Sequence, residues 1–143
     1  DMHRALNRLF ATRRVEKRYV ALVAGRMAAG EQVIDLPLIA DWPNRPRQRV
    51  DHAIGKPSRT RLRVAGYEPA LDATRVELFP ETGRSHQLRV HLQAIGHPIL
   101  GDELYAPQEV FARAPRLLLH AAFLGFFHPS TAAALQVESA APF

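Results

Sequence analysis

Apolar residues recur along this chain with two different periods, and each period predicts one kind of secondary structure. A helical period of three to four residues runs from Met2 to Thr12 and again from Ser85 to Ile95, which predicts two amphipathic helices. Short runs of β-forming residues between turn residues predict strands. These runs are Arg18 to Val23, Gln32 to Leu36, Arg75 to Phe79, Leu117 to Phe127 and Leu135 to Val137.

The second predicted helix has a clear buried side. Its apolar face contains Leu88, Leu92 and Ile95, and His91 lies on the same face at helical spacing. We expect Ser85 to be the N-cap and Gly96 to end the helix. On this face His91 is predicted to be a packed, hydrogen-bonded core histidine rather than a catalyst.

A strict alternation marks the most basic tract of the chain. Arg59, Arg61 and Arg63 alternate with Thr60, Leu62 and Val64, so that a strand would carry three guanidinium groups on one face and three packing side chains on the other. The basic face would be either a solvated surface or an edge that contacts RNA. The preceding stretch from Asp41 to Pro46 holds two prolines and is predicted to be a loop.

These elements predict an α+β fold with a mixed, mainly antiparallel sheet and flanking helices, because several strands are interrupted by two helices without a regular βαβ repeat. A chain of 143 residues with 47% hydrophobic content is long enough for one core of ordinary size. We therefore expect residues 1–143 to form a single domain or part of one.

The charge of the chain is concentrated in its first half. Residues 1–71 contain 14 Lys and Arg against 7 Asp and Glu, whereas residues 72–143 contain 5 against 7. Such a surface attracts a polyanion, which favours nucleic acid, RNA or DNA, as partner, although a basic surface can also serve solubility alone. No apolar run approaches the ~18 residues that span a bilayer, and no secretory leader opens the sequence, so we expect no membrane partner and a cytoplasmic location.

Cofactor and metal chemistry find little support in the sequence. The chain has no cysteine, which excludes thiolate metal sites. His86 and His91 would lie about 140° apart around a helix, without a third ligand at zinc spacing. Phosphate-loop, dinucleotide-binding and nucleophilic-serine motifs are also missing. We predict no metal and no cofactor.

Three ordered motifs carry a family resemblance. Lys17 to Val23, Glu81 to His91, and Leu118 to Ala121 followed by His128-Pro129 resemble the lysine/tyrosine strand, arginine motif and C-terminal strand of RluA-type pseudouridine synthases. The stretches Asp41 to Gln48 and Gly96 to Asp102 are similar to the subgroup that modifies both the tRNA anticodon stem-loop and 23S ribosomal RNA. The resemblance implies an enzyme that isomerises uridine in structured RNA without a cofactor.

The family's nucleophilic aspartate belongs to a His-Arg-Leu-Asp segment that precedes these motifs, and this tetrapeptide does not occur here. Neither Asp1 nor Asp102 matches it. By this resemblance we expect the C-terminal part of a catalytic domain, inactive by itself. The alternative is a non-catalytic RNA-binding module.

Arg84 follows Gly83 at the mouth of the predicted helix, where backbone N–H groups and the helix dipole favour an anion. A salt bridge at the helix start is its structural alternative. The resemblance implies that Arg84 orients the catalytic aspartate and that Tyr19 lies against the target uracil, although a strand tyrosine also serves in core packing. The resemblance and the basic tract together predict substrate-binding roles for Lys17, Arg47, Arg59, Arg61 and Leu119.

Overall fold

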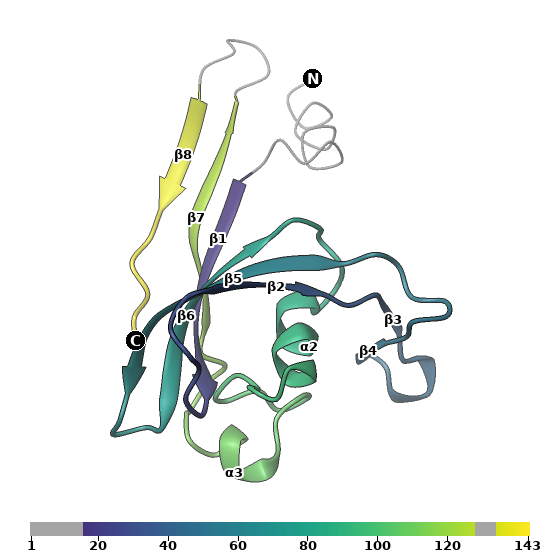
Figure 1. The fold of residues 1–143 in the computed structure, drawn as a ribbon, viewed down its shortest axis with the longest axis horizontal. Coiled ribbons are helices and arrows are strands. Elements are labelled where there is room, and N and C mark those ends of the chain that lie inside the picture. The colour runs from purple at the N-terminus through teal and green to yellow at the C-terminus, as the bar shows by residue number, and fades with distance from the viewer. Residues whose placement is uncertain (1–15, 128–133) are drawn as a thin grey trace.

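The structure, a computed structural model, describes residues 16–127 and 134–143, and its centre is a six-stranded sheet with the order β2-β5-β6-β1-β7-β8. All pairings between described strands are antiparallel. The sheet twists so strongly that β2 and β5 run across the direction of β7 and β8 (Figure 1). Its strands are β1 (Glu16–Ala24), β2 (Glu31–Asp35), β5 (Arg59–Glu68), β6 (Ala73–Pro80), β7 (Leu119–Phe127) and β8 (Ala134–Glu138).

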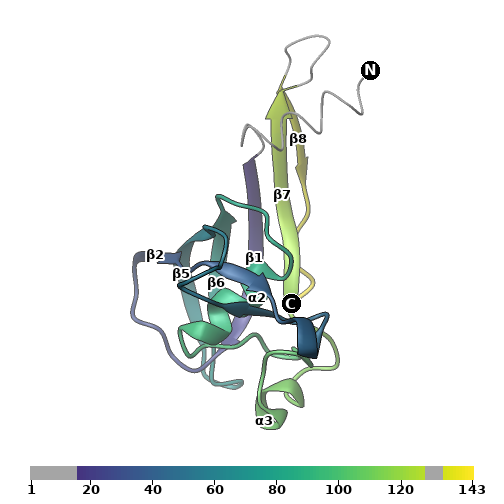
Figure 2. The same ribbon diagram turned by 90° about the vertical axis from the view of Figure 1, so that its right-hand side faces the viewer.

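The five strands predicted from β-forming runs and the alternating strand at Arg59 are all confirmed, as is the α+β class with a mainly antiparallel sheet. Within the described residues the sheet is wholly antiparallel rather than mixed. The predicted helix from Met2 to Thr12 lies outside the described residues. In Figure 2 the sheet is turned, and α2 and α3 are seen to lie beside the lower part of β1 and β7.

The alternation in β5 separates its two faces as predicted. Thr60 and Leu62 are wholly buried, whereas the intervening arginines are exposed. Leu62 pairs with Leu78 of β6, which in turn pairs with Tyr19 of β1. Because directly paired residues lie on the same side of a sheet, these three side chains share the face that α2 covers.

Helix α2 (Gln87–Ala94) packs its buried side against this face. The prediction of Ser85 as N-cap was wrong: the cap is His86, which has a left-handed backbone (φ 53°) and makes no side-chain capping bond. The helix end was predicted correctly. Gly96 has φ 86°, and the N–H of His97 bonds the carbonyl of Leu92, which closes the helix in a Schellman motif.

A small hairpin that the sequence did not predict stands at one end of the sheet. It consists of β3 (Leu38–Ala40) and β4 (Gln48–Val50), and the short 3₁₀ turn η1 (Trp42–Asn44) lies in the predicted loop between them. Leu38 packs with Val90 of α2 and with Tyr105 in a second buried cluster. The hairpin is therefore anchored to the helix as well as to the sheet.

The remaining helix of the described residues is short. It is α3 (Gln108–Phe111), which the sequence analysis did not predict. Val110 on this helix joins the main core. No helix in the described ranges is long and apolar enough to cross a membrane.

Candidate active site

Arg84 lies in the turn between β6 and α2, half-buried. Its Nε and one Nη donate to the carbonyl oxygen of Pro57, at 3.2 and 3.1 Å. No ion pair with Arg84 is formed among residues 16–127 and 134–143. These two bonds use one edge of the guanidinium, which has five N–H donors in all. The N–H groups at its end, one on each Nη, stay available for a carboxylate. The salt bridge considered as its structural role is thus replaced by a bond to a neutral carbonyl.

The turn is held by Gln87, whose importance the sequence analysis missed. Its Oε1 accepts the N–H of Arg84 at 3.1 Å and the hydroxyl of Thr82 at 2.7 Å. Its Nε2 donates to the carbonyl of Arg59 and the hydroxyl of Thr60, both at 2.9 Å. A buried amide with all these partners fixes the turn against β5. The available signal was a glutamine four residues before His91, on the buried face.

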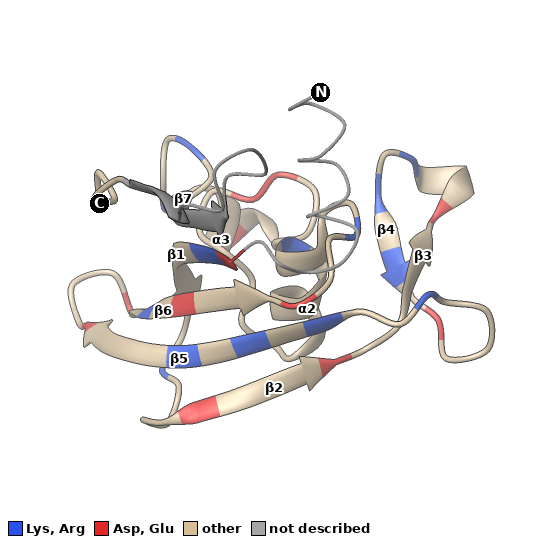
Figure 3. Cartoon of the chain, turned by 90° about the horizontal axis from the view of Figure 1, so that it is seen from above, with Lys and Arg blue, Asp and Glu red and all other residues tan. Residues whose placement is uncertain are grey.

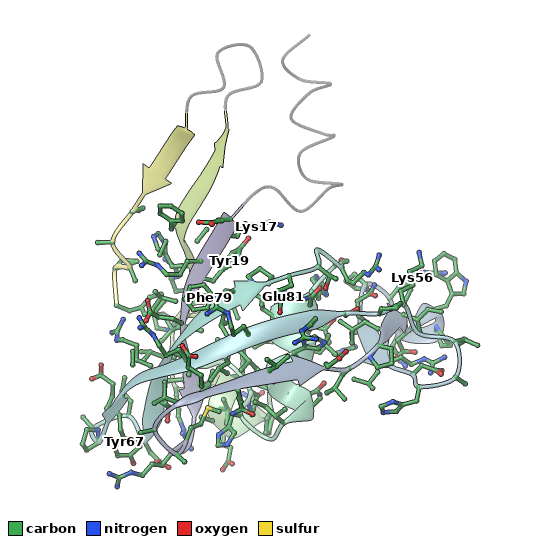
Figure 4. The ribbon with its side chains drawn as sticks, turned by 45° about the horizontal axis from the view of Figure 1, so that its top comes forward. Lys17, Tyr19, Lys56, Tyr67, Phe79 and Glu81 are labelled. Carbon is green, nitrogen blue, oxygen red and sulfur yellow. The ribbon has the colours of Figure 1, made fainter. Side chains whose placement is uncertain are left out.

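Lys17 and Tyr19 approach this turn from β1. A Cβ built on Gly83 would lie 3.6 Å from the Nζ of Lys17, so the ammonium group is beside the residue that precedes Arg84. Tyr19 is half-buried and packs on the main core. Figure 4 shows both side chains projecting from β1 near Phe79 and Glu81 of the neighbouring strand end. The structure therefore brings Lys17 together with the arginine turn, and Tyr19 lies two residues further along the same strand.

Leu119 lies on the same sheet face, because it pairs with Ala21, which follows Tyr19 by two positions. It is half-buried and packs on the main core. This contact is the packing role that any strand leucine can fill. Ala121 pairs directly with Tyr19 and is therefore nearer than Leu119 to the end of the sheet at which Lys17 and the Arg84 turn lie.

The three arginines of β5 lie on the opposite face of the sheet from Tyr19, as their register shows. Arg59 Nε donates to Glu81 at 3.0 Å, and Arg63 pairs with Glu77. The guanidinium of Arg61 lies 4.3 Å from the centre of the Phe79 ring. The blue bands of β5 in Figure 3 thus run beside acidic positions of the neighbouring strands, and part of the basic face is neutralised.

Arg47 serves in the attachment of the β3–β4 hairpin. Its Nε donates to the carbonyl of Leu104 at 3.0 Å, and the N–H of Gln48 donates to the hydroxyl of Tyr105 at 2.8 Å. That hydroxyl lies 2.7 Å from Nδ1 of His86, the N-cap residue of α2. Having accepted the Gln48 N–H, the phenol can donate its proton to His86. Burial, and next the charge of Arg89, lower the pKa of His86, which favours this neutral acceptor.

His91 is the core histidine that its helical position predicted. It is wholly buried, with Nε2 2.9 Å from the carbonyl of Leu36 and Nδ1 2.9 Å from the hydroxyl of Thr60. A carbonyl only accepts, so Nε2 carries the proton and Nδ1 accepts from Thr60. Burial lowers the pKa of His91, in agreement with a neutral ring. This histidine stabilises the packing of α2 and has no open position for catalysis.

The arrangement can hold one anionic group at the turn. The end-on donors of Arg84 can fix the direction of a carboxylate, and a guanidinium there would lower the carboxyl pKa. The nearby ammonium of Lys17 adds positive charge, and Tyr19 presents an aromatic ring on the adjoining strand. Within the described parts of the chain, no group of three metal-ligating side chains is clustered.

A twisted antiparallel sheet, with an arginine turn that leads into a buried helix, is the architecture of a known family of RNA-modifying enzymes. The chain belongs to the RNA pseudouridylate synthase family, whose model matches residues 1–94. The family resemblance drawn from the three sequence motifs is thereby confirmed.

Curated relatives share much of the sequence. The chain is 51% identical over 140 residues to the protein of Escherichia coli strain K12 named dual-specificity RNA pseudouridine synthase RluA. It is 52% identical over 130 residues to the protein of that name from Vibrio vulnificus. The matched regions cover 98% and 89% of this chain but 64% and 52% of these relatives. The chain thus spans less than two thirds of their length.

Solved structures share the fold. Human RNA pseudouridylate synthase domain containing 1 superposes with a TM-score of 0.82 and 32% identity, over 96% of this chain and 59% of the human chain. Human RNA pseudouridylate synthase domain containing 4 gives a TM-score of 0.78 and 26% identity, over 99% of this chain and 64% of its own.

Proposed function

We propose that this chain supplies the C-terminal part of the catalytic domain of an RNA pseudouridine synthase. The observation that carries the proposal is the fixed Arg84, whose end-on donors are available. The ammonium of Lys17 lies beside Gly83, the residue before Arg84. Such a turn is suited to a carboxylate from another part of the protein. The nucleophilic aspartate expected from the family pattern is a group of this kind.

The reaction would be an isomerisation of uridine in which atoms balance without a co-reactant. The bond from the sugar C1′ to N1 of uracil breaks, the base rotates, and C1′ rejoins the base at C5. The proton lost from C5 is balanced by one gained at N1. No cofactor is needed, and the aspartate acts at the sugar or assists there.

Each residue of the site would have a distinct part. Arg84 orients the aspartate and keeps it ionised, so it is a positioning group for the nucleophile. Tyr19 lies against the extruded uracil, since a flat ring can stack on a base taken out of its helix. Lys17 and Leu119 line the same side, where Lys17 adds charge and Leu119 an apolar wall.

The substrate would be structured RNA with unpaired loops, such as a tRNA anticodon stem-loop or ribosomal RNA, in the cytoplasm. The basic first half of the chain and the names of its relatives support this choice. Arg61 is the β5 arginine that we propose for phosphate contact, because its guanidinium has no carboxylate partner in the described part of the chain. Arg59 and Arg47 are already held by Glu81 and Leu104 and would support the site indirectly.

The test is to join the segment that precedes this region in the relatives to the N-terminus of the 143-residue chain. The resulting joined protein is then assayed for pseudouridine formation in an unmodified anticodon stem-loop. We expect product from the joined protein and none from the 143-residue chain. Arg84→Ala should lower turnover by at least 100-fold while RNA affinity changes less than threefold. Arg84→Lys, which keeps the charge but loses the fork, should fall between the two.

The matched control is Arg113→Ala, which removes an exposed arginine whose hydrogen bond to the carbonyl of Asp72 is long, at 3.5 Å. It should retain full turnover. RNA binding without any pseudouridine from the joined protein would refute the proposal and favour the non-catalytic RNA-binding module.

A further inference from the structure

The tip of the β3–β4 hairpin exposes an aromatic ring that no packing role explains. Trp42 in η1 is 68% exposed, and Ile54 in the turn after β4 is 62% exposed. They are the two most exposed large apolar side chains of the described residues, and both belong to the lobe formed by residues 38–56. Neither is part of either buried cluster.

One cation is already stacked on the exposed indole. The guanidinium carbon of Arg45 lies 4.3 Å from the centre of the Trp42 ring. Given the high exposure of Trp42, much of the ring is left to solvent. A ring with a cation on one side can receive a flat base on the other, while the same cation reaches a phosphate next to that base.

The lobe keeps a positive charge after its internal contacts are counted. Residues 41–56 contain four Lys and Arg and two Asp. Asp51 is paired with Arg49, and the N–H groups of Ile54 and Ala53, followed by Arg49, lower the pKa of its carboxyl. Arg45 and Lys56 are exposed and form no ion pair in the described ranges. The other acid, Asp41, accepts a hydrogen bond from the neutral Asn44 side chain, so four Lys and Arg less two Asp leave the lobe with a net charge of +2. This positive charge favours a polyanion as the partner of the lobe.

The loop that carries Trp42 is ordered before any partner binds. The N–H of Asp41 donates to the carbonyl of Arg47 at 2.8 Å, and the N–H of Asn44 donates to the carbonyl of Asp41 at 2.9 Å. The Asn44 side chain donates to the Asp41 carboxylate at 3.0 Å. Arg47 fastens the loop to Leu104. A ring on a preorganised loop loses little entropy when a base stacks on it.

The lobe is also continuous with the candidate active site. Lys56, labelled in Figure 4 at the hairpin end of the sheet, precedes Pro57, whose carbonyl binds Arg84. An RNA whose target uridine is extruded beside Tyr19 has further unpaired nucleotides in the same loop. The Arg84 turn and the lobe are thus connected through Pro57, which follows the lobe in the chain.

We propose that this lobe is a second RNA contact, in which Trp42 stacks on an unpaired base of the substrate loop and Arg45 binds the adjoining phosphate. The inference rests on the proposed function, since that function makes RNA the substrate. It adds a contact outside the uridine pocket that selects for single-stranded nucleotides near the target.

The chain offers a direct probe, because Trp42 is its single tryptophan. The intrinsic fluorescence of the 143-residue chain should be quenched by an anticodon stem-loop RNA and much less by a blunt duplex with the same stem. Trp42→Ala should weaken stem-loop binding by about fivefold to 100-fold, and Trp42→Phe, which keeps an aromatic ring, by less than threefold. Ile54→Ala is the matched control, since it removes a similarly exposed but non-aromatic side chain of the lobe, and it should change affinity less than twofold.

Several results would overturn the inference. The first is a Trp42→Ala chain with the same affinity for the stem-loop as the parent, including the case in which neither binds. The second is an Ile54→Ala chain whose affinity falls as much as that of Trp42→Ala. The third is an equal fall in the affinity of Trp42→Ala for the blunt duplex. The first result would favour a protein as the partner of the exposed Trp42. Circular dichroism melting of each variant verifies that the exposed substitutions leave the fold intact.

The joined protein separates this inference from the proposed function. There Trp42→Ala should raise KM for the stem-loop at least fivefold with kcat unchanged. An unchanged KM with normal turnover would refute the second contact and leave the proposed function standing. Stem-loop binding that depends on Trp42, with no pseudouridine formed, would refute the enzyme and support the contact.

Discussion

The guanidinium of Arg89 holds both carboxylate oxygens of Asp102, with Nε and Nη2 at 3.0 and 2.7 Å. Asp102 is wholly buried and also accepts the N–H groups of Leu104 and Tyr105. This bond to Asp102 is the main cause that raises the pKa of Arg89. The ion pair thus joins α2 to the segment that anchors the hairpin, and Asp102 has a structural role rather than that of a nucleophile.

We predict that Asp102→Ala destabilises the fold by about 3–5 kcal/mol, because it leaves the largely buried charge of Arg89 without its partner. Urea unfolding followed by circular dichroism measures the loss. Arg49→Ala is the control: it breaks the more exposed pair with Asp51, which water screens, and should cost much less stability. Equal effects of the two substitutions would contradict the assigned role of the Arg89–Asp102 pair.

The burial of His91 predicts a dependence of stability on pH. In the unfolded chain a histidine takes up a proton near pH 6.5, whereas burial lowers the pKa of His91 in the fold. The unfolded state therefore binds more protons as pH falls through about 6.5, and stability must decrease there. The pKa of His86 is lowered too and adds in the same direction. Melting temperatures between pH 7.5 and 5.5 should show this decrease.

Two substitutions assign the effect. His91→Asn should lower stability at pH 7.5 and flatten the pH profile, because the group that resists protonation is gone. His52→Asn, which removes a histidine from an exposed turn, is the control for the general effect of a His→Asn change. A profile for His91→Asn that runs parallel to that of the parent would assign the pH dependence to other groups.

Two glycines with similar backbones should respond differently to alanine. Gly101 has φ 80°, and a Cβ there would lie 1.9 Å from the carbonyl oxygen of Arg116. Gly96 has φ 86° with nothing within 4 Å of the same position. We expect Gly96→Ala to cost about 1–2 kcal/mol for the left-handed backbone alone. Gly101→Ala should cost at least about 2 kcal/mol more, because backbone must move.

Thermal or urea unfolding of both variants tests this difference. Both alanines carry the cost of a left-handed backbone, so the difference between the two losses reports the contact at Gly101 alone. If both lose the same stability, the close approach of the Arg116 backbone to Gly101 is absent in solution.

Local patterns in the sequence predicted much of this fold. The strand runs, the alternation from Arg59 to Val64, the buried face of α2 and its end at Gly96 were all correct, because burial repeats with a period of two in strands and about 3.6 in helices. His91 could be assigned to the core for the same reason. The motifs around Lys17 and Arg84 also indicated the family before any contact was known.

Other features depend on pairings that no local pattern contains. The sequence showed which side chains of β5 share a face, but not that Arg59 and Arg61 lie across the sheet from Tyr19, because that depends on the register of β5, β6 and β1. Gln87 was missed since its partners, Arg59 and Thr60, are 28 and 27 residues away.

The hairpin was missed for a similar reason. Strands of three residues around two prolines carry no periodic signal, and this pair is held by buried contacts of Leu38 with Val90 and Tyr105. By itself the sequence determined the periodic elements, the family and the basic first half of the chain. Only the tertiary structure decided which charges are neutralised, which ring stays exposed and which donors of Arg84 stay available, because each depends on groups that meet only when the chain is folded.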